Sequence, residues 1–194
     1  MNKLKVNRAI KKVCMFMLLT FTPMTFANEA NLSLLFTPEN AKYWQYISDR
    51  VMGGVSDGTV AIEHDGELFF ARLKGNVSTK NNGGFIQLRS AISFANSEKN
   101  GNQVKGMRLN VRGNDETYHV FIRTDQMRSY SDYYSAQFEA SANWQVIDLP
   151  FNKFKRNRSN DSNLNANTIR SMAIVAYGRD FISDVSVSKI EFYY

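Results

Sequence analysis

Apolar and polar residues alternate over short stretches through most of the chain after residue 58. A period of two predicts half-buried β-strands, because successive side chains of a strand point to opposite faces. The predicted strands cover residues 59–63, 68–73, 85–90, 107–112, 118–124, 133–140, 144–149, 169–176 and 185–192. Clusters of Gly, Asn, Asp or Ser separate most of these stretches. Nine short strands at this spacing predict an all-β fold, an antiparallel β-sandwich or jelly roll.

Three segments between or before these strands have distinct patterns. No window shows a sustained helical period, and residues 41–47 are the best place for a short helical turn. Asp65 and Gly66 lie between the first two predicted strands and predict a hairpin, because both residue types tolerate positive φ. Residues 152–167 form a long loop rich in Asn, Ser, Lys and Arg. A loop of that length in a compact domain is expected to be functional or mobile.

Four predicted strands carry polar and aromatic side chains opposite their apolar ones. If residues 85–90, 107–112, 118–124 and 134–140 share one sheet, these side chains gather on its outer face. The candidate set is Gln87, Arg89, Arg112, His119, Phe121, Arg123 and Gln137, with Phe85 and Glu139 beside them. One interpretation is an ordinary solvated face. The other is a ligand face, because planar Arg and Gln donors beside aromatic rings suit a sugar or an acidic partner.

The first 27 residues have the three-part pattern of a secretory signal peptide. Residues 1–12 contain five basic residues and no acidic one, and residues 13–27 form an apolar run that ends in Thr-Phe-Ala. We therefore expect an exported protein, periplasmic or secreted, with one domain over residues 28–194. A retained membrane anchor is the alternative. The run is short for a bilayer span and Pro23 interrupts it, so we expect no stable membrane insertion after signal cleavage.

Charge and cysteine content narrow the function classes further. The whole chain has a net charge of +6, with 24 basic and 18 acidic residues. Five of the 24 basic residues and none of the 18 acidic residues lie in the predicted signal, so the net charge of residues 28–194 is +1. A domain this close to neutral has no general attraction for polyanions, and we expect no nucleic-acid partner. The one cysteine, Cys14, belongs to the signal, which excludes thiol chemistry from the remaining domain.

Residue types typical of catalytic and metal sites are few. The chain has two histidines, His64 in the predicted hairpin turn and His119 on the candidate face. There is no Gly-x-Ser-x-Gly nucleophile motif, no pair of carboxylates marked by its spacing, and no calcium-binding loop. We therefore expect no catalytic residues, no metal site and no cofactor, and we keep enzymatic activity only as a residual alternative.

Two double-glycine segments stand out between the predicted strands. The first contains Met52, Gly53 and Gly54 and is followed by Ser56; the second contains Asn82, Gly83 and Gly84. Paired glycines permit a tight turn or a close backbone approach. Neither segment is a phosphate-binding loop, because no Lys-Ser/Thr pair follows and no helix begins there. On physical grounds, both segments are expected to be structural turns.

These turns belong to a longer series of motifs. Residues 111–114 (Val-Arg-Gly-Asn) precede Tyr118, and residues 144–151 (Trp-Gln-Val-Ile-Asp-Leu-Pro-Phe) precede Phe154. In this order, the motifs resemble the complex I intermediate-associated protein thirty family over roughly residues 44–192. Mitochondrial members of that family are assembly factors for the respiratory NADH:ubiquinone oxidoreductase.

The resemblance implies a galactose-binding-like β-sandwich, similar to some carbohydrate-binding modules, without catalytic residues. The resulting hypothesis is an exported, non-enzymatic module that binds a protein partner or assists its assembly. The alternative is a carbohydrate-binding module that uses the polar sheet face.

Overall fold

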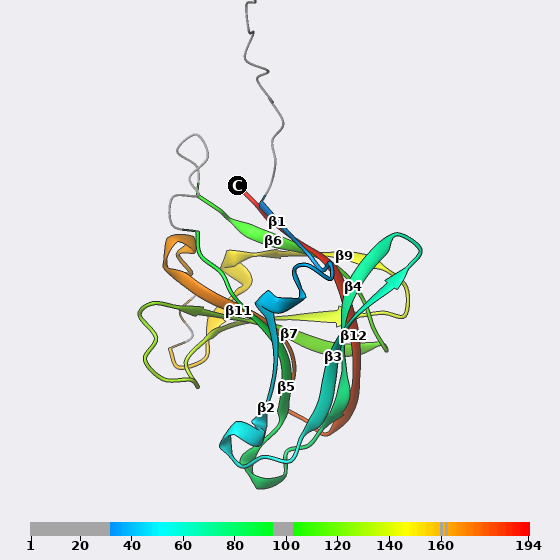
Figure 1. Ribbon diagram of the computed structural model, residues 1–194. Helices are drawn as coiled ribbons and strands as arrows, with labels where there is room; N and C mark the ends of the chain where they lie inside the picture. Colours follow the sequence, from blue (N-terminus) through cyan, green and yellow to red (C-terminus); the bar gives the residue numbers. More distant parts are fainter. Residues whose placement is uncertain (1–31, 95–102, 160, 162) are drawn as a thin grey trace, which may run out of the picture. The chain divides into compact units, whose positions relative to one another are not determined.

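Two antiparallel β-sheets pack face to face in the computed structural model of this protein, as a β-sandwich (Figure 1). The structure describes residues 32–94, 103–159, 161 and 163–194. The predicted signal peptide, residues 1–27, lies outside the described residues. Within the described ranges, no helix has the length and apolar character needed to cross a membrane.

The first sheet, called sheet A here, has six strands with β12 near its centre. Its order is β3-β4-β12-β6-β9, and β1 also pairs with β12. The strands are β1 (Leu32–Leu35), β3 (Asp57–Asp65), β4 (Leu68–Val77), β6 (Gly106–Arg112), β9 (Gln145–Pro150) and β12 (Phe181–Tyr193). β12 is long enough, at 13 residues, to pair with β4, β1 and β6 along different parts of its length.

The second sheet, called sheet B here, has the order β10-β8-β7-β11-β5-β2. Its strands are β2 (Trp44–Ser48), β5 (Phe85–Ala91), β7 (Glu116–Thr124), β8 (Tyr134–Ala140), β10 (Lys155–Arg156) and β11 (Ile169–Tyr177). Short 3-10 turns connect the strands: η1 (Ala41–Tyr43), η2 (Asp49–Met52), η3 (Lys80–Asn82), η4 (Phe151–Lys153) and η5 (Ala166–Thr168).

The core lies between the two sheets and follows the alternation seen in the sequence. In β7, Tyr118, Val120 and Ile122 are fully buried. In β6, on the other sheet, Leu109 and Val111 are fully buried in the same apolar cluster. Apolar burial of this kind is the main favourable contribution to folding, so a continuous core can hold the domain without disulfides.

The predicted all-β sandwich is confirmed, and the hairpin at Asp65 and Gly66 joins β3 to β4. The short helical turn expected within residues 41–47 is present but covers only Ala41–Tyr43, and Trp44 already begins β2. Pairing with β5 explains the difference, because Gln45 lies opposite Arg89 in that ladder. The sequence analysis also missed β1 and β10; β10 lies inside the loop expected at residues 152–167.

Candidate functional site

The two double-glycine turns meet around one buried carboxylate, that of Asp49. Asp49 begins η2 and is fully buried. Its Oδ1 accepts a hydrogen bond from the Ser56 backbone N–H at 2.9 Å, and its Oδ2 accepts one from the Ser56 hydroxyl at 2.5 Å. Oδ2 also accepts the backbone N–H groups of Gly84 at 2.6 Å and Phe85 at 3.2 Å. One side chain therefore connects the turn after β2 to the turn before β5.

The hydrogen bonds determine the ionisation of this carboxyl group. Burial alone would raise the pKa of Asp49, but the donors of Gly84, Ser56 and Phe85 outweigh burial and hold that pKa below its ordinary value. Asp49 is therefore an anion at neutral pH. Its donors come from Ser56 on one side and from Gly84 and Phe85 on the other, so the carboxylate joins two distant segments of the chain, which indicates a structural role.

Gly54 and Gly83 leave room for the Asp49 side chain. A Cβ atom at Gly54 would lie 2.3 Å from the Asp49 carboxyl carbon, and one at Gly83 would lie 2.4 Å from Oδ2. Gly53 has a different role, since its φ of +91° ends η2 in the left-handed region and nothing lies within 4 Å of its absent side chain. The interpretation of Met52, Gly53, Gly54, Ser56, Asn82, Gly83 and Gly84 as structural turns fits this geometry.

The η2 turn also presents two apolar side chains to solvent. Val51 is 75% exposed and Met52 is 63% exposed. Because the Asp49 carboxylate ties this turn to Ser56, Gly84 and Phe85 by hydrogen bonds, the two exposed side chains belong to a well-anchored turn.

Another motif of the series fixes the end of the sandwich near β7. The Tyr118 hydroxyl donates to the Asn114 side-chain oxygen at 2.5 Å and accepts the Asp184 backbone N–H at 2.9 Å. These bonds connect the turn before β7 to β12 in the other sheet. This part of the motif series also has a structural explanation.

Six of the seven candidate ligand-face residues lie together on the outer face of sheet B: Gln87, Arg89, His119, Phe121, Arg123 and Gln137. Strand β11 lies between β5 and β7, and its Ala173 pairs with both Arg89 of β5 and Phe121 of β7. The candidate residues of β5 and those of β7 therefore lie on either side of β11. On the other side of β7, His119 lies opposite Gln137 of β8.

Arg112 is the exception, and its predicted place on this face is wrong. β6 pairs with β12 and β9 in sheet A, so Arg112 lies on the outer face of the opposite sheet. Its guanidinium carbon is 4.8 Å from the ring centroids of both Phe70 and Trp144, and it forms an ion pair with Asp65 at 3.9 Å. The alternation within β6 was correct, but alternation does not tell which sheet a strand joins.

Aromatic rings cluster on the outer face of sheet B. Phe121 stacks on Tyr133 with ring centroids 3.9 Å apart and an interplanar angle of 15°. Tyr177 meets Phe121 edge-on at 5.2 Å and His119 at 5.5 Å. His119 also contacts Ser135, with 3.3 Å between Nδ1 and the hydroxyl oxygen.

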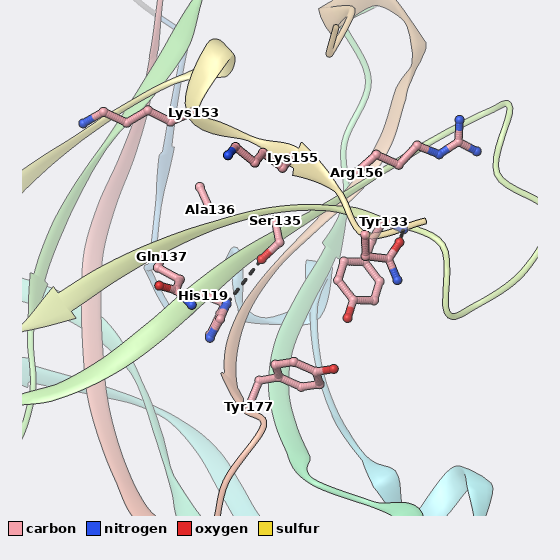
Figure 2. Close-up of a pocket in the computed structure, with 10 residues that line it drawn as sticks. His119, Tyr133, Ser135, Ala136, Gln137, Lys153, Lys155, Arg156 and Tyr177 are labelled. Atoms are coloured by element: carbon pink, nitrogen blue, oxygen red, sulfur yellow. Dashed lines mark hydrogen bonds between the residues drawn. The ribbon is translucent and has the colours of Figure 1, made fainter. Parts of the chain in front are cut away.

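A pocket of about 460 Å³ opens beside this cluster (Figure 2). Its lining is His119, Tyr133, Ser135, Ala136, Gln137, Lys153, Lys155, Arg156, Asn157 and Tyr177. Figure 2 shows Lys153, at the end of η4, and Lys155, in the strand β10 that pairs with β8, extending in the same direction. Within the described part of the chain, neither Asp nor Glu lines this pocket.

The Tyr133 hydroxyl and the His119 imidazole are uncharged at neutral pH. Burial, followed by interaction with the Tyr177 hydroxyl, raises the pKa of Tyr133 above its ordinary value. Burial, followed by the positive charge of Arg179, lowers the pKa of His119, so its ring is neutral at pH 7. Neutral hydroxyl and imidazole groups can donate and accept hydrogen bonds, which suits a polar ligand.

The sequence analysis missed several lining residues. Tyr177 could have been found, since extending the alternation of β11 past residue 176 places it on the same face as Ala173 and Val175. Lys155 could not, because nothing in the loop sequence indicated that β10 would pair with β8, and the position of Lys153 in η4, just before β10, was equally hidden. Among the described residues, no group of three or more His, Cys, Asp or Glu side chains could hold a metal ion.

The sandwich is similar to solved structures of carbohydrate-binding modules. The family 11 carbohydrate-binding module of the cellulosomal cellulase Lic26A-Cel5E of Clostridium thermocellum matches with a TM-score of 0.64 and 13% identity, over 84% of this chain and 95% of that one. A family 11 module of the same organism, in complex with a β-1,3-1,4-mixed-linked tetrasaccharide, matches with a TM-score of 0.63 and 12% identity, over 82% of this chain and 94% of that one. At these identities, the likeness shows the fold.

An exo-β-agarase also matches, with a TM-score of 0.56 and 6% identity, over 84% of this chain and 25% of that one. No curated protein sequence matches this chain. The family model of Complex I intermediate-associated protein 30 (CIA30) matches residues 34–184, which include both double-glycine turns and most of both sheets. This chain therefore belongs to the CIA30 family.

Proposed function

We propose that this protein is a non-enzymatic binding module whose ligand is a saccharide, held in the pocket on the outer face of sheet B. The observation that carries the proposal is the placement of Tyr133 and Tyr177 beside the side-chain amides of Gln137 and Asn157. A sugar ring offers a C–H face, which packs on an aromatic ring, and hydroxyl groups, which pair with amides and neutral hydroxyls. The pocket supplies both kinds of partner.

The lining residues favour binding over catalysis. Glycoside hydrolysis generally uses two carboxyl groups that flank the scissile bond, and the described lining has none. Ser135 and His119 are in contact, but a hydrolytic triad also needs an acidic group to orient the imidazole. The neighbours of the His119 ring are instead Phe121 and Tyr177.

The likeness of the fold supports a saccharide as the ligand. One similar structure is a carbohydrate-binding module in complex with a tetrasaccharide. A shared fold does not carry a shared ligand by itself, because many functions occur on one fold. The likeness therefore adds weight to the pocket chemistry and does not replace it.

A polypeptide partner is the second candidate, and family membership favours it. The family takes its name from a complex I intermediate. Val51 and Met52 are exposed on the anchored η2 turn and could contact a partner protein, since exposed apolar side chains often mark interaction sites. In this alternative, the module assists the assembly of another protein through the turn instead of the pocket.

We also propose that the protein acts after export. The basic and apolar pattern of residues 1–27 supports a cleaved signal and a periplasmic or secreted location. Structural polysaccharides are accessible in such locations. A nucleic-acid partner is not part of the proposal, since residues 28–194 have a net charge of only +1.

The test is a binding screen of the full chain against neutral and acidic polysaccharides by affinity electrophoresis. Tyr177→Ala removes a ring of the pocket, and Tyr43→Ala removes an exposed ring of η1 that does not line the pocket. We expect at least one polysaccharide to retard the wild-type protein. Tyr177→Ala should weaken that binding roughly tenfold or more, and Tyr43→Ala should leave it unchanged.

Two outcomes would overturn the proposal. One is the absence of retardation by every polysaccharide offered. The other is retardation that Tyr177→Ala does not affect. Capture of a defined protein that is lost in the Val51→Ser, Met52→Ser double variant and kept in Tyr177→Ala would establish the polypeptide alternative instead.

A further inference from the structure

Two arginines, Arg89 and Arg123, differ from the other arginines of the strands, including Arg156 and Arg170 of sheet B, which form ion pairs with Asp132 and Asp125. Sheet A has three arginines in its strands, and each forms an ion pair: Arg72 with Asp184 and Glu63, Arg108 with Asp148, and Arg112 with Asp65. On sheet B, Arg89 and Arg123 have no ion pair among the described residues. They lie on the face that carries the pocket and the aromatic cluster.

Arg89 leans across β11 toward Arg123. Its Nη2 donates to the Ser171 hydroxyl at 3.2 Å, and Ser171 lies directly opposite Arg123 in the β7–β11 ladder. Burial, followed by the positive charge of Arg123, lowers the pKa of Arg89. Two guanidinium groups are thus held near each other without a described carboxylate between them, and an anion placed there would relieve their repulsion.

Arg123 is fixed in place while keeping donors available. Its Nε donates to the Asp132 carbonyl at 3.3 Å and its Nη2 to the Ser129 carbonyl at 2.9 Å. Nη1 has no hydrogen-bond partner among the described residues. Because Asp132 immediately precedes Tyr133, these bonds hold the guanidinium next to the stacked pair of Tyr133 and Phe121.

The pocket itself is also lined by positively charged side chains. Lys153 and Lys155 line it, are exposed, and form no ion pair among the described residues. Arg156 differs, because its guanidinium forms two hydrogen bonds with the buried Asp132 carboxylate, at 2.9 and 2.6 Å. This site is positive although the domain is close to neutral, so the charge is concentrated where the ligand would lie.

We propose that the saccharide bound on this face is anionic, with its carboxylate or sulfate groups held by the two pocket lysines and the two unpaired arginines. This inference rests on the proposed function, since it names the class of saccharide that the same site binds. The aromatic rings bind the sugar faces, and the cations on either side of the rings select the charged groups. A neutral polysaccharide would leave all four cations without a counter-charge.

The experiment compares the full chain on four polysaccharides by affinity electrophoresis and calorimetry: polygalacturonate for carboxylate groups, carrageenan for sulfate groups, and a mixed-linked β-glucan and a galactan as neutral probes. The site variants are Lys153→Gln with Lys155→Gln, and Arg89→Gln with Arg123→Gln. The matched control is Lys74→Gln with Lys105→Gln, which removes the same charge from exposed residues outside the pocket.

We expect an acidic polysaccharide to bind at least roughly tenfold more tightly than either neutral one, because charge-assisted hydrogen bonds are about twice as strong as neutral ones. Each site variant should lose most of that preference, and the control should keep it. Binding should also weaken as salt rises from about 50 mM to about 500 mM. Preference for polygalacturonate or for carrageenan identifies the charged group.

The outcomes separate this inference from the proposed function. Equal affinity for neutral and acidic polysaccharides, with loss of both in Tyr177→Ala, would overturn the anionic selectivity and keep the saccharide site. An acidic preference that the Lys74→Gln, Lys105→Gln control loses equally would also overturn it, as an effect of net charge. Binding to none of the four would overturn both proposals.

Discussion

The Ser56 hydroxyl donates to the buried Asp49 carboxylate at 2.5 Å and accepts the Ser78 backbone N–H at 2.9 Å. These two side chains connect η2, the start of β3, the end of β4 and the turn before β5. Because both family-motif turns close around the Asp49 carboxylate, mutations here act on stability. We therefore expect substitutions in the motif to change the stability of the protein, and substitutions in the pocket to change ligand binding.

Asp49→Asn should destabilise the protein by about 2–4 kcal/mol at pH 7, because four N–H or O–H donors would then face a neutral amide in a buried site. The folded-state pKa of Asp49 is below its unfolded value of about 3.9, so the carboxylate's stabilisation is complete above that value and is lost as the pH falls through the lower folded pKa. Urea unfolding between about pH 2 and pH 8 measures both effects.

Asp57→Asn is the matched control for that experiment. Asp57 is exposed and forms an ion pair with Arg50 at 3.3 Å, so its loss should cost less than about 1 kcal/mol. The difference in unfolding free energy between the wild type and Asp49→Asn should shrink below about pH 4. A difference that stays constant down to the acid limit would show that the Asp49 charge does not contribute.

Gly54→Ala should destabilise the protein by more than about 3 kcal/mol or prevent folding, because the new Cβ would overlap the Asp49 carboxyl group. Gly53→Asn should cost only about 1 kcal/mol, since Asn tolerates the left-handed conformation and the site is open. Thermal unfolding of the two variants compares neighbouring glycines of one motif. Equal losses would contradict the close approach of Gly54 to Asp49.

Arg112→Ala should destabilise the protein by about 1–2 kcal/mol and leave saccharide binding unchanged. The guanidinium covers the rings of Phe70 and Trp144, and its removal would expose them. Arg112→Met keeps an apolar cover without the charge and should recover part of the stability. A loss of ligand affinity without a loss of stability would instead indicate that Arg112 belongs to the ligand site.

Local patterns predicted most of the fold. In β7, the alternation correctly placed Tyr118 inside and His119 outside, because the period of a strand is a local property of the chain. The pairing of strands is not local. Arg112 and Arg123 have the same local pattern, yet they lie on opposite outer faces of the sandwich.

Less of the candidate site could be predicted, because it also depends on which strands pair. Lys155 reaches the pocket because β10 pairs with β8, and a two-residue strand has no periodicity to detect. Asp49 lies shortly before the first double-glycine segment in the sequence. Its role depends on hydrogen bonds from Gly84 and Phe85, which are 35 and 36 residues away. Such contacts become visible only when the ladders between distant strands are known.

The position of β12 in sheet A has a consequence for biosynthesis. β12 pairs with β4, β1 and β6, and all three are made before it. The ion pair between Arg72 of β4 and Asp184 of β12 spans 112 residues, which corresponds to on the order of ten seconds of translation. During that interval, β4 and β6 expose edges that β12 will later cover. The nascent chain is therefore open to edge-to-edge association, or to capture by a chaperone, until residues 181–193 emerge.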